Sequence, residues 1–390
     1  MWLYPMLGYL NTGLAEYLLK TINPTLNTNV GEVQSLPFDY DSELSAQVTQ
    51  LAEECVKLAK DDWNASETAW DFKQLPIVTF HAVTLQRSQD AADAECLARF
   101  ARMKELEEKN NRLFIDACGL QDELSPEVPN DQITLYKPNR QKDIERLLSY
   151  ALGCAMGRFS LDKPGLIYAN SGNEGFDASQ YKTFPADSDG IIPITEIDWF
   201  DDAAARRFEE FVGVAWPNEH LEENLKFVAE SLGAKSSEQP RDTIRRYYAD
   251  DFYTNHLQTY KRRPIYWMFT SGKLGAFQCL VYLHRYNEGT LARMRTEYVI
   301  PLQGKINARI DQLEGDKSKA APTHKKRLEK EQELLKKQQA ELVKFDEKLR
   351  HYADMRIKLD LDDGVKVNYG KFGDLLANVT QVCGRGEEDE

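Results

Sequence analysis

The chain has 390 residues, a formal net charge of −14 and a hydrophobic content of 42%. This length allows two or three domains with separate cores, and the composition excludes wholesale disorder. No apolar run approaches the roughly 20 residues that span a bilayer, and residues 1–7 lack the features of a signal peptide. The six cysteines have no C-x-x-C spacing, so we expect reduced thiols in a cytoplasmic protein that contacts no membrane.

Residues 1–38 predict a helix followed by a turn-rich stretch. Apolar residues recur at three- and four-residue steps from Leu7 to Ile22, and turn-forming residues follow as far as Pro37. The segment is too short for a free-standing domain, and no strand precedes it. We therefore interpret it as the tail end of a domain whose body is missing.

Residues 39–238 predict a helical domain. An apolar stripe with helical spacing runs from Leu44 through Leu51 to Leu58. Further helices are expected at about 86–113, 142–156 and 221–232. A loop-rich insert at about 161–198 contains Asn170-Ser171-Gly172, but it lacks the lysine and the strand–helix frame of a phosphate-binding loop.

Residues 239–300 form a basic and aromatic segment, which we expect to be helical. Ten Lys and Arg stand against five Asp and Glu between positions 241 and 300, although the chain as a whole is acidic. We expect the aromatic residues at 266–269 to be core, and Leu280 and Val281 to lie on the buried face of a following helix. The arginines either pair with the chain's own acids or contact phosphate. The candidate phosphate contacts are Arg245, Arg246, Arg262, Arg263, Lys273 and Arg285.

Residues 301–358 predict an antiparallel helical hairpin of the coiled-coil type. Leucines recur every seven residues from Leu328 to Leu349, and a second apolar stripe ends at Leu313, before a turn-forming stretch. Polar Glu331 and Gln338 occupy seam positions, which argues against a long parallel homodimer but leaves an oligomerisation zipper as an alternative. Residues 359–390 predict a short closing segment, with a β-turn at Asp363-Gly364, and an acidic tail. The predicted fold is therefore mainly α.

Several stretches resemble a known protein family. They are SETAWDF (66–72), FIDACGLQDEL (114–124), GRFSLDKPGL (157–166), RRPIYW (262–267), HRY (284–286) and LDLDDGVKVNY (359–369). Together they are similar to the C-terminal region of the adenine-specific DNA methyltransferases of type 1 BREX (bacteriophage exclusion) systems. The opening 38 residues resemble the closing part of the target-recognition domain of such enzymes. Its polar residues Asn23, Thr25 and Asn27 are candidates for target recognition, although we expect them to shape a turn rather than read bases.

The resemblance implies S-adenosylmethionine-dependent methylation of adenine, which marks host DNA in phage defence, with the catalytic domain preceding the region seen here. The chain has no adjacent prolines for the turn that holds a flipped adenine, no glycine-rich cofactor turn and no H-x-x-x-H metal motif. We therefore expect no catalytic, cofactor-binding or metal-binding residue in this chain, and no methylation by it alone. A Ser-His-Asp or Cys-His site stays open, because its members need not be close in sequence.

Duplex DNA is the first expected partner. A separate N-terminal methyltransferase half and other BREX proteins are further expected partners, with S-adenosylmethionine bound outside this chain. The alternative function is a non-catalytic scaffold that docks other defence proteins through its acidic surface, since a net charge of −14 opposes DNA binding.

Overall fold

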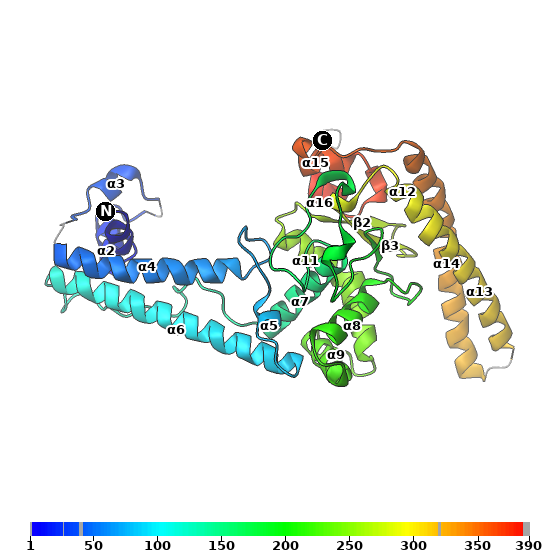
Figure 1. Ribbon diagram of the computed structural model, residues 1–390, viewed down its shortest axis with the longest axis horizontal. Helices are drawn as coiled ribbons and strands as arrows, with labels where there is room; N and C mark the ends of the chain where they lie inside the picture. Colours follow the sequence, from blue (N-terminus) through cyan, green and yellow to red (C-terminus); the bar gives the residue numbers. More distant parts are fainter. Residues whose placement is uncertain (1, 26, 39–41, 319–320, 385–390) are drawn as a thin grey trace. The chain divides into compact units, whose positions relative to one another are not determined.

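The computed structural model describes residues 2–25, 27–38, 42–318 and 321–384 (Figure 1). The chain divides into two compact units. The first unit consists of Met1–Asp71 and Gln89–Asn139, and the second consists of Phe72–Ser88 and Arg140–Glu390. The fold is mainly α, as predicted, while the boundaries of the five predicted segments stay a prediction.

The first unit is built on two long helices, α4 (Ser42–Asn64) and most of α6 (Leu85–Ala117), which lie side by side. They run antiparallel, because Arg102 of α6 pairs with Glu54 and Arg99 pairs with Asp62. Shorter helices α1 (Leu3–Leu10), α2 (Gly13–Ile22) and α3 (Val30–Gln34) complete the unit. Its main core cluster contains Tyr9, Leu14, Ala15, Leu36, Val48 and Phe114.

The opening segment has two helices where the sequence predicted one. The break follows from Thr12, whose hydroxyl accepts a hydrogen bond from the backbone N–H of Ala15 at 3.1 Å and so caps α2. A third helix also begins inside the predicted turn-rich stretch. Asn29 and Glu32 form a reciprocal capping box there, which stabilises the short helix α3.

The second unit surrounds a small antiparallel sheet in the order β1-β3-β2. Its strands are β1 (Ile191–Pro193), β2 (Tyr266–Thr270) and β3 (Gln278–Tyr282). Val281 pairs with Ile191 on one side and with Trp267 on the other. The helix predicted to bury Leu280 and Val281 is therefore wrong, because these residues lie in the central strand.

Both faces of the sheet are covered. Tyr266 stacks on His256, with ring centroids 4.9 Å apart, while Trp267 packs against Tyr369, with ring centroids 5.3 Å apart. The aromatic residues at 266–269 are buried, as expected. The helices before the sheet's last two strands are α5 (Pro76–Thr79), α7 (Arg140–Ala155), α8 (Ala204–Ala215), α9 (Leu221–Ser231), α10 (Pro240–Arg246) and α11 (Phe252–Thr259).

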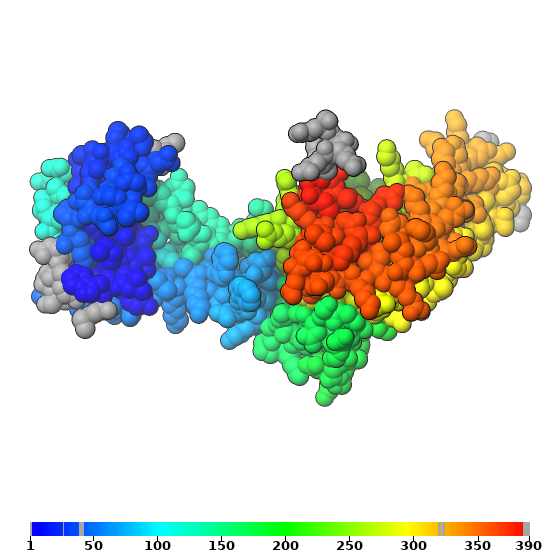
Figure 2. Space-filling model, turned by 90° about the horizontal axis from the view of Figure 1, so that it is seen from above, coloured from blue at the N-terminus to red at the C-terminus, as the bar shows by residue number. Residues whose placement is uncertain are grey.

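The second unit continues with a helical hairpin. After the short α12 (Thr290–Arg293), helices α13 (Ile300–Lys317) and α14 (Pro322–Asp354) lie side by side in both views (Figures 1 and 2). The hydrogen bond between Asn307 and Gln339 and the Arg309–Glu331 ion pair at 2.6 Å show that they run antiparallel. The heptad leucines of α14 form the buried seam, so the hairpin is present as predicted, while its coiled-coil character stays a prediction.

One detail of the hairpin and one of the closing segment bear on the sequence-based expectations. The polar seam residue Gln338 is buried and donates a hydrogen bond to the carbonyl of Leu274 at 3.1 Å, so it anchors the β2–β3 turn. The β-turn predicted at Asp363-Gly364 is wrong, because a 3₁₀ turn there leads directly into a helix. The chain closes with α15 (Gly364–Gly370) and α16 (Val379–Cys383).

Candidate nucleic-acid interface

Arg285 cannot serve as a phosphate contact in this structure. Its side chain is fully buried, stacks 3.7 Å from the ring centroid of Phe176, and donates to the backbone carbonyls of Asp187 and Ser188 at 3.0 and 2.9 Å. Gly190, with φ +74°, leaves space for the first carbons of this side chain, because a Cβ there would lie 2.9 Å from Arg285 Cβ. Arg285 therefore connects loops inside the second unit, and we remove it from the candidate phosphate contacts.

Arg245 and Arg246 are occupied by carboxylates. Arg245 pairs with Asp242 at 2.8 Å and with Asp198 at 3.5 Å. Arg246 contacts both carboxylate oxygens of Glu238, at 2.8 and 3.0 Å, and this hydrogen bonding lowers the pKa of Glu238 to about 2. Contact with phosphate would require these ion pairs to break, so both arginines are weak candidates.

The turn after α11 presents three consecutive cations, Lys261, Arg262 and Arg263, which we call the basic turn. All three are exposed, and none has a carboxylate within ion-pair distance in the described part of the chain. The N–H of Arg262 bonds to the carbonyl of Leu257 at 2.7 Å, as in a Schellman cap. Lys261 and Arg262 have φ angles of +50° and +61°, a conformation that non-glycine residues seldom adopt, so the cap fixes an otherwise unfavourable turn.

His256 fixes the junction between the basic turn and β2. Its Nε2 accepts hydrogen bonds from the backbone N–H groups of Ile265 and Tyr266, both at 3.1 Å. Because burial lowers the pKa of His256 to about 3, the ring is neutral and keeps Nε2 as an acceptor at physiological pH. The buried His256 ring therefore holds the chain in place directly after the basic turn.

Arg158 adds a fourth cation near the basic turn. Its guanidinium lies 4.5 Å from the ring centroid of Phe159 and 5.4 Å from that of Tyr260, and it donates a hydrogen bond to the Tyr260 hydroxyl. Sequence reasoning missed this residue as part of the site. The 157–166 stretch was noted for its resemblance, but no local pattern links it to a turn 100 residues later.

Lys273 lies exposed in the β2–β3 turn, which is fastened to the helical hairpin. The carboxylate of Glu341 on α14 accepts hydrogen bonds from the Ser271 hydroxyl at 2.7 Å and from the N–H groups of Leu274 and Ala276 at 2.9 and 3.2 Å. The basic turn and Lys273 thus lie at opposite ends of β2, each held by buried or partly buried polar groups. The structure does not gather all six predicted residues in one patch.

The three predicted residues of the opening segment shape a turn, as expected. The N–H of Thr25 bonds to Asn23 Oδ1 at 3.0 Å, and Thr25 Oγ1 donates to the carbonyl of Asn27 at 3.2 Å. Asn23 Nδ2 also donates to Glu32 Oε1 at 2.7 Å, which ties the turn to α3. These side chains are engaged with one another, so base recognition by them stays a prediction.

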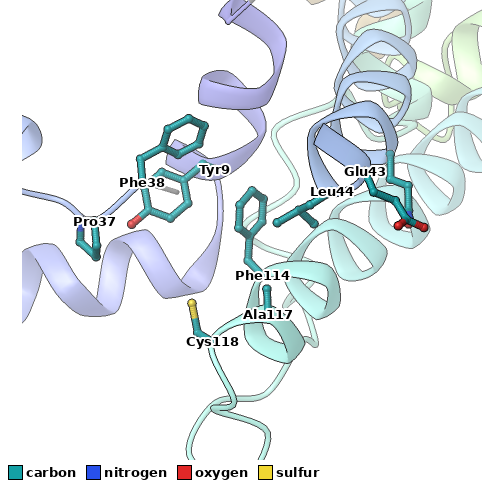
Figure 3. Close-up of a pocket in the computed structure, with 9 residues that line it drawn as sticks. Tyr9, Pro37, Phe38, Glu43, Leu44, Phe114, Ala117 and Cys118 are labelled. Atoms are coloured by element: carbon teal, nitrogen blue, oxygen red, sulfur yellow. The ribbon is translucent and has the colours of Figure 1, made fainter. Parts of the chain in front are cut away.

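A pocket of about 450 Å³ lies in the first unit (Figure 3). Three aromatic rings contribute to its walls, with the Tyr9 ring 5.3 Å from Phe38 and 5.2 Å from Phe114. Cys118 and Glu43 also line it, and Figure 3 shows Glu43 at the opposite side of the pocket from Cys118. This arrangement does not pair a nucleophile with a base, so we assign no chemistry to it.

Comparison with known proteins gives two related sequences. The chain is 41% identical over 410 residues to the adenine-specific methyltransferase BrxX of Escherichia coli O9:H4 (strain HS), an alignment that covers 99% of this chain and 34% of the relative. It is 40% identical over 374 residues to the adenine-specific methyltransferase PglX of Lacticaseibacillus casei (strain Zhang), covering 94% of this chain and 31% of the relative. The chain thus spans about a third of these curated relatives. No family model matches it.

Within the described ranges, no helix is both long and apolar enough to cross a bilayer.

Proposed function

Because the chain belongs to the family of the BrxX and PglX adenine-specific methyltransferases over about a third of their length, we propose that it is the C-terminal, non-catalytic part of such an enzyme. In this proposal it binds duplex DNA, while the remaining part of the enzyme binds S-adenosylmethionine and methylates adenine. The complete protein then marks host DNA in a BREX phage-defence system.

The basic turn carries the DNA-binding part of this proposal. Its three cations are exposed on an acidic chain whose other clustered arginines, such as Arg245 and Arg246, are neutralised by carboxylates. Unpaired cations at a fixed turn attract a polyanion and release its condensed counterions when they contact phosphate. Lys273 supplies an exposed charge at the other end of β2.

Duplex binding measured against salt concentration tests this proposal. We expect the logarithm of the binding constant to fall linearly with the logarithm of salt, and Arg262→Ala or Arg263→Ala to reduce the slope by about one each. Lys226→Ala is the control, because that exposed lysine already lies near Glu230 on α9. Salt-independent or absent binding, by the chain alone and by its complex with a methyltransferase half, would overturn the assignment.

A second surface supports an association with the rest of a methyltransferase. Pro5, Gly8 and Tyr9 are the buried residues of α1, which packs on α4, yet the other side of α1 is also apolar. Leu3 is 74% exposed and Leu7 38% exposed, without a charged residue anywhere in the helix. A helix that is apolar on all sides is normally buried, so we propose that the remaining two thirds of the enzyme cover this face.

The acidic charge of the chain favours a second candidate function, a protein-interaction scaffold. A net charge of −14 opposes contact with DNA outside the basic patches. Affinity purification from the native host, with and without nuclease, separates the two functions. Defence proteins that remain bound after nuclease treatment, together with absent duplex binding by the purified chain, would favour the scaffold.

A further inference from the structure

The end of the helical hairpin carries a second group of exposed cations. Lys325, Lys326, Arg327 and Lys330 lie in the first turns of α14, and we call them the hairpin-tip cluster. Figures 1 and 2 show that the start of α14 and the end of α13 lie at the end of the hairpin away from the sheet. The cluster is therefore separate from the basic turn, which leads into β2.

The cations of the hairpin-tip cluster are not neutralised. None of the four has a carboxylate within ion-pair distance among the residues that the structure describes, and Glu329 is the one acidic residue between positions 324 and 330. Some other cations of the hairpin are paired: Lys317 with Glu314 at 2.9 Å, and Lys337 with Glu333 at 2.8 Å. The four unpaired cations of the tip lie within residues 325–330, whereas the exposed cations Lys336, Lys344 and Arg350 are spaced along the rest of the helix.

The arrangement of the cluster suits a phosphate backbone. Lys326 and Lys330 are four residues apart and share one side of the helix, with Lys325 and Arg327 flanking them. Four residues of helix rise about 6 Å, a span over which duplex DNA presents several phosphate charges. The partial positive charge at the N-terminal end of a helix adds to the same field. No Phe, Tyr or Trp lies among residues 324–330 to stack on a base.

We propose that the hairpin-tip cluster is a second, sequence-independent contact of this chain with the backbone of duplex DNA. This inference rests on the proposed function, since it assumes that the chain binds duplex through the basic turn. It adds a distant second point of contact, so that the hairpin fixes the orientation of the duplex without reading its sequence. The basic surface is thereby divided between two elements of the second unit.

A charge-matched pair of variants tests this inference. In the tip variant, Lys325, Lys326 and Arg327 are each replaced by Gln. The control variant replaces Lys336, Lys344 and Arg350 by Gln, which removes the same charge from exposed positions of the same helix. Binding to a 30-base-pair duplex is measured across a series of salt concentrations, and circular dichroism verifies equal helix content.

We expect the tip variant to reduce the magnitude of the salt slope by two to three, on the basis of about one phosphate contact per cation, and the control variant by less than one. An unchanged slope in the tip variant, while Arg262→Ala and Arg263→Ala still reduce it, would overturn this inference and leave the proposed function standing. Equal reductions in both triple variants would also overturn it, because they would reflect net charge alone. Absent binding by the unmodified chain would overturn the proposed function itself.

Discussion

Two carboxyl groups and one hydroxyl meet in the interior of the second unit. The hydroxyl of Tyr298 lies 3.0 Å from Asp189 Oδ2 and 2.8 Å from Asp202 Oδ2, and a single O–H donates fully to one acceptor at a time. Burial, followed by the influence of Asp187, raises the pKa of Asp189 to about 7. Asp189 is therefore largely protonated at slightly acidic pH, so that less negative charge lies beside the Tyr298 hydroxyl.

This pKa predicts that Asp189 makes the folded state less stable as pH rises. Its folded pKa of about 7 exceeds its usual value of 3.8, so between these limits the folded state binds more protons than the unfolded state. The free energy of unfolding should fall in that window, by up to about 1.4 kcal/mol per pH unit from this group. Asp189→Asn, which mimics the neutral acid, should remove this contribution.

Urea unfolding of both proteins between pH 5 and 8 provides the measurement. The difference between variant and wild type isolates Asp189 from other groups such as His256, whose lowered pKa acts in the opposite direction below about pH 6.5. A difference that stays constant over this range would contradict the prediction.

Single arginines show what sequence can and cannot locate. Arg262 and Arg263 were candidate phosphate contacts on the basis of charge alone, and the structure places both in an exposed turn that the sequence did not predict. Arg285 has a similar aromatic neighbourhood in sequence, yet it is buried by loops around Asp187 and Gly190 from almost 100 residues earlier. Burial of a long cation depends on such distant carbonyl groups, which no local pattern reveals.

At the scale of elements, long amphipathic helices were predictable and short buried strands were not. The heptad leucines of α14 have a periodicity that only a helix satisfies, and they are buried in the hairpin. Strands β2 and β3 are covered on both faces, so their apolar runs show no alternation and resemble the buried face of a helix. Their identity depends on pairing with each other and with β1.

The contact between α14 and the β2–β3 turn gives a prediction for Glu341. Glu341→Ala removes the acceptor for three hydrogen bonds, from Ser271, Leu274 and Ala276, at a cost of about 1–3 kcal/mol in local stability. Hydrogen–deuterium exchange of the peptide covering 271–277 should therefore become faster. The rest of the sheet should keep its protection, because its backbone bonds remain.

Glu347→Ala is the matched control for this experiment, since Glu347 is an exposed glutamate on the same helix. It should leave exchange at 271–277 unchanged. Equal protection of the turn in Glu341→Ala and wild type would show that the turn holds its conformation without α14.

At the scale of the molecule, each compact unit has exposed features that its own fold does not explain. The second unit presents unpaired cations at the basic turn and at the hairpin-tip cluster, which suit a polyanion. The first unit instead presents an apolar face on α1, which suits another protein surface. The chain also spans only about a third of its methyltransferase relatives. Together these observations favour the proposal that the chain binds DNA through its second unit and the rest of the enzyme through its first unit.

The apolar face of α1 gives the prediction that distinguishes this arrangement. The remaining two thirds of the Escherichia coli relative, expressed as a separate chain, should co-elute with this chain in size-exclusion chromatography. Leu3→Ser combined with Leu7→Ser should weaken that association at least tenfold, because each exposed leucine would otherwise bury apolar surface worth about 1–2 kcal/mol. Leu334→Ser combined with Val343→Ser is the control, since these residues are 43% and 44% exposed on α14. Equal weakening by both double variants, or no association with the unmodified chain, would contradict docking through α1.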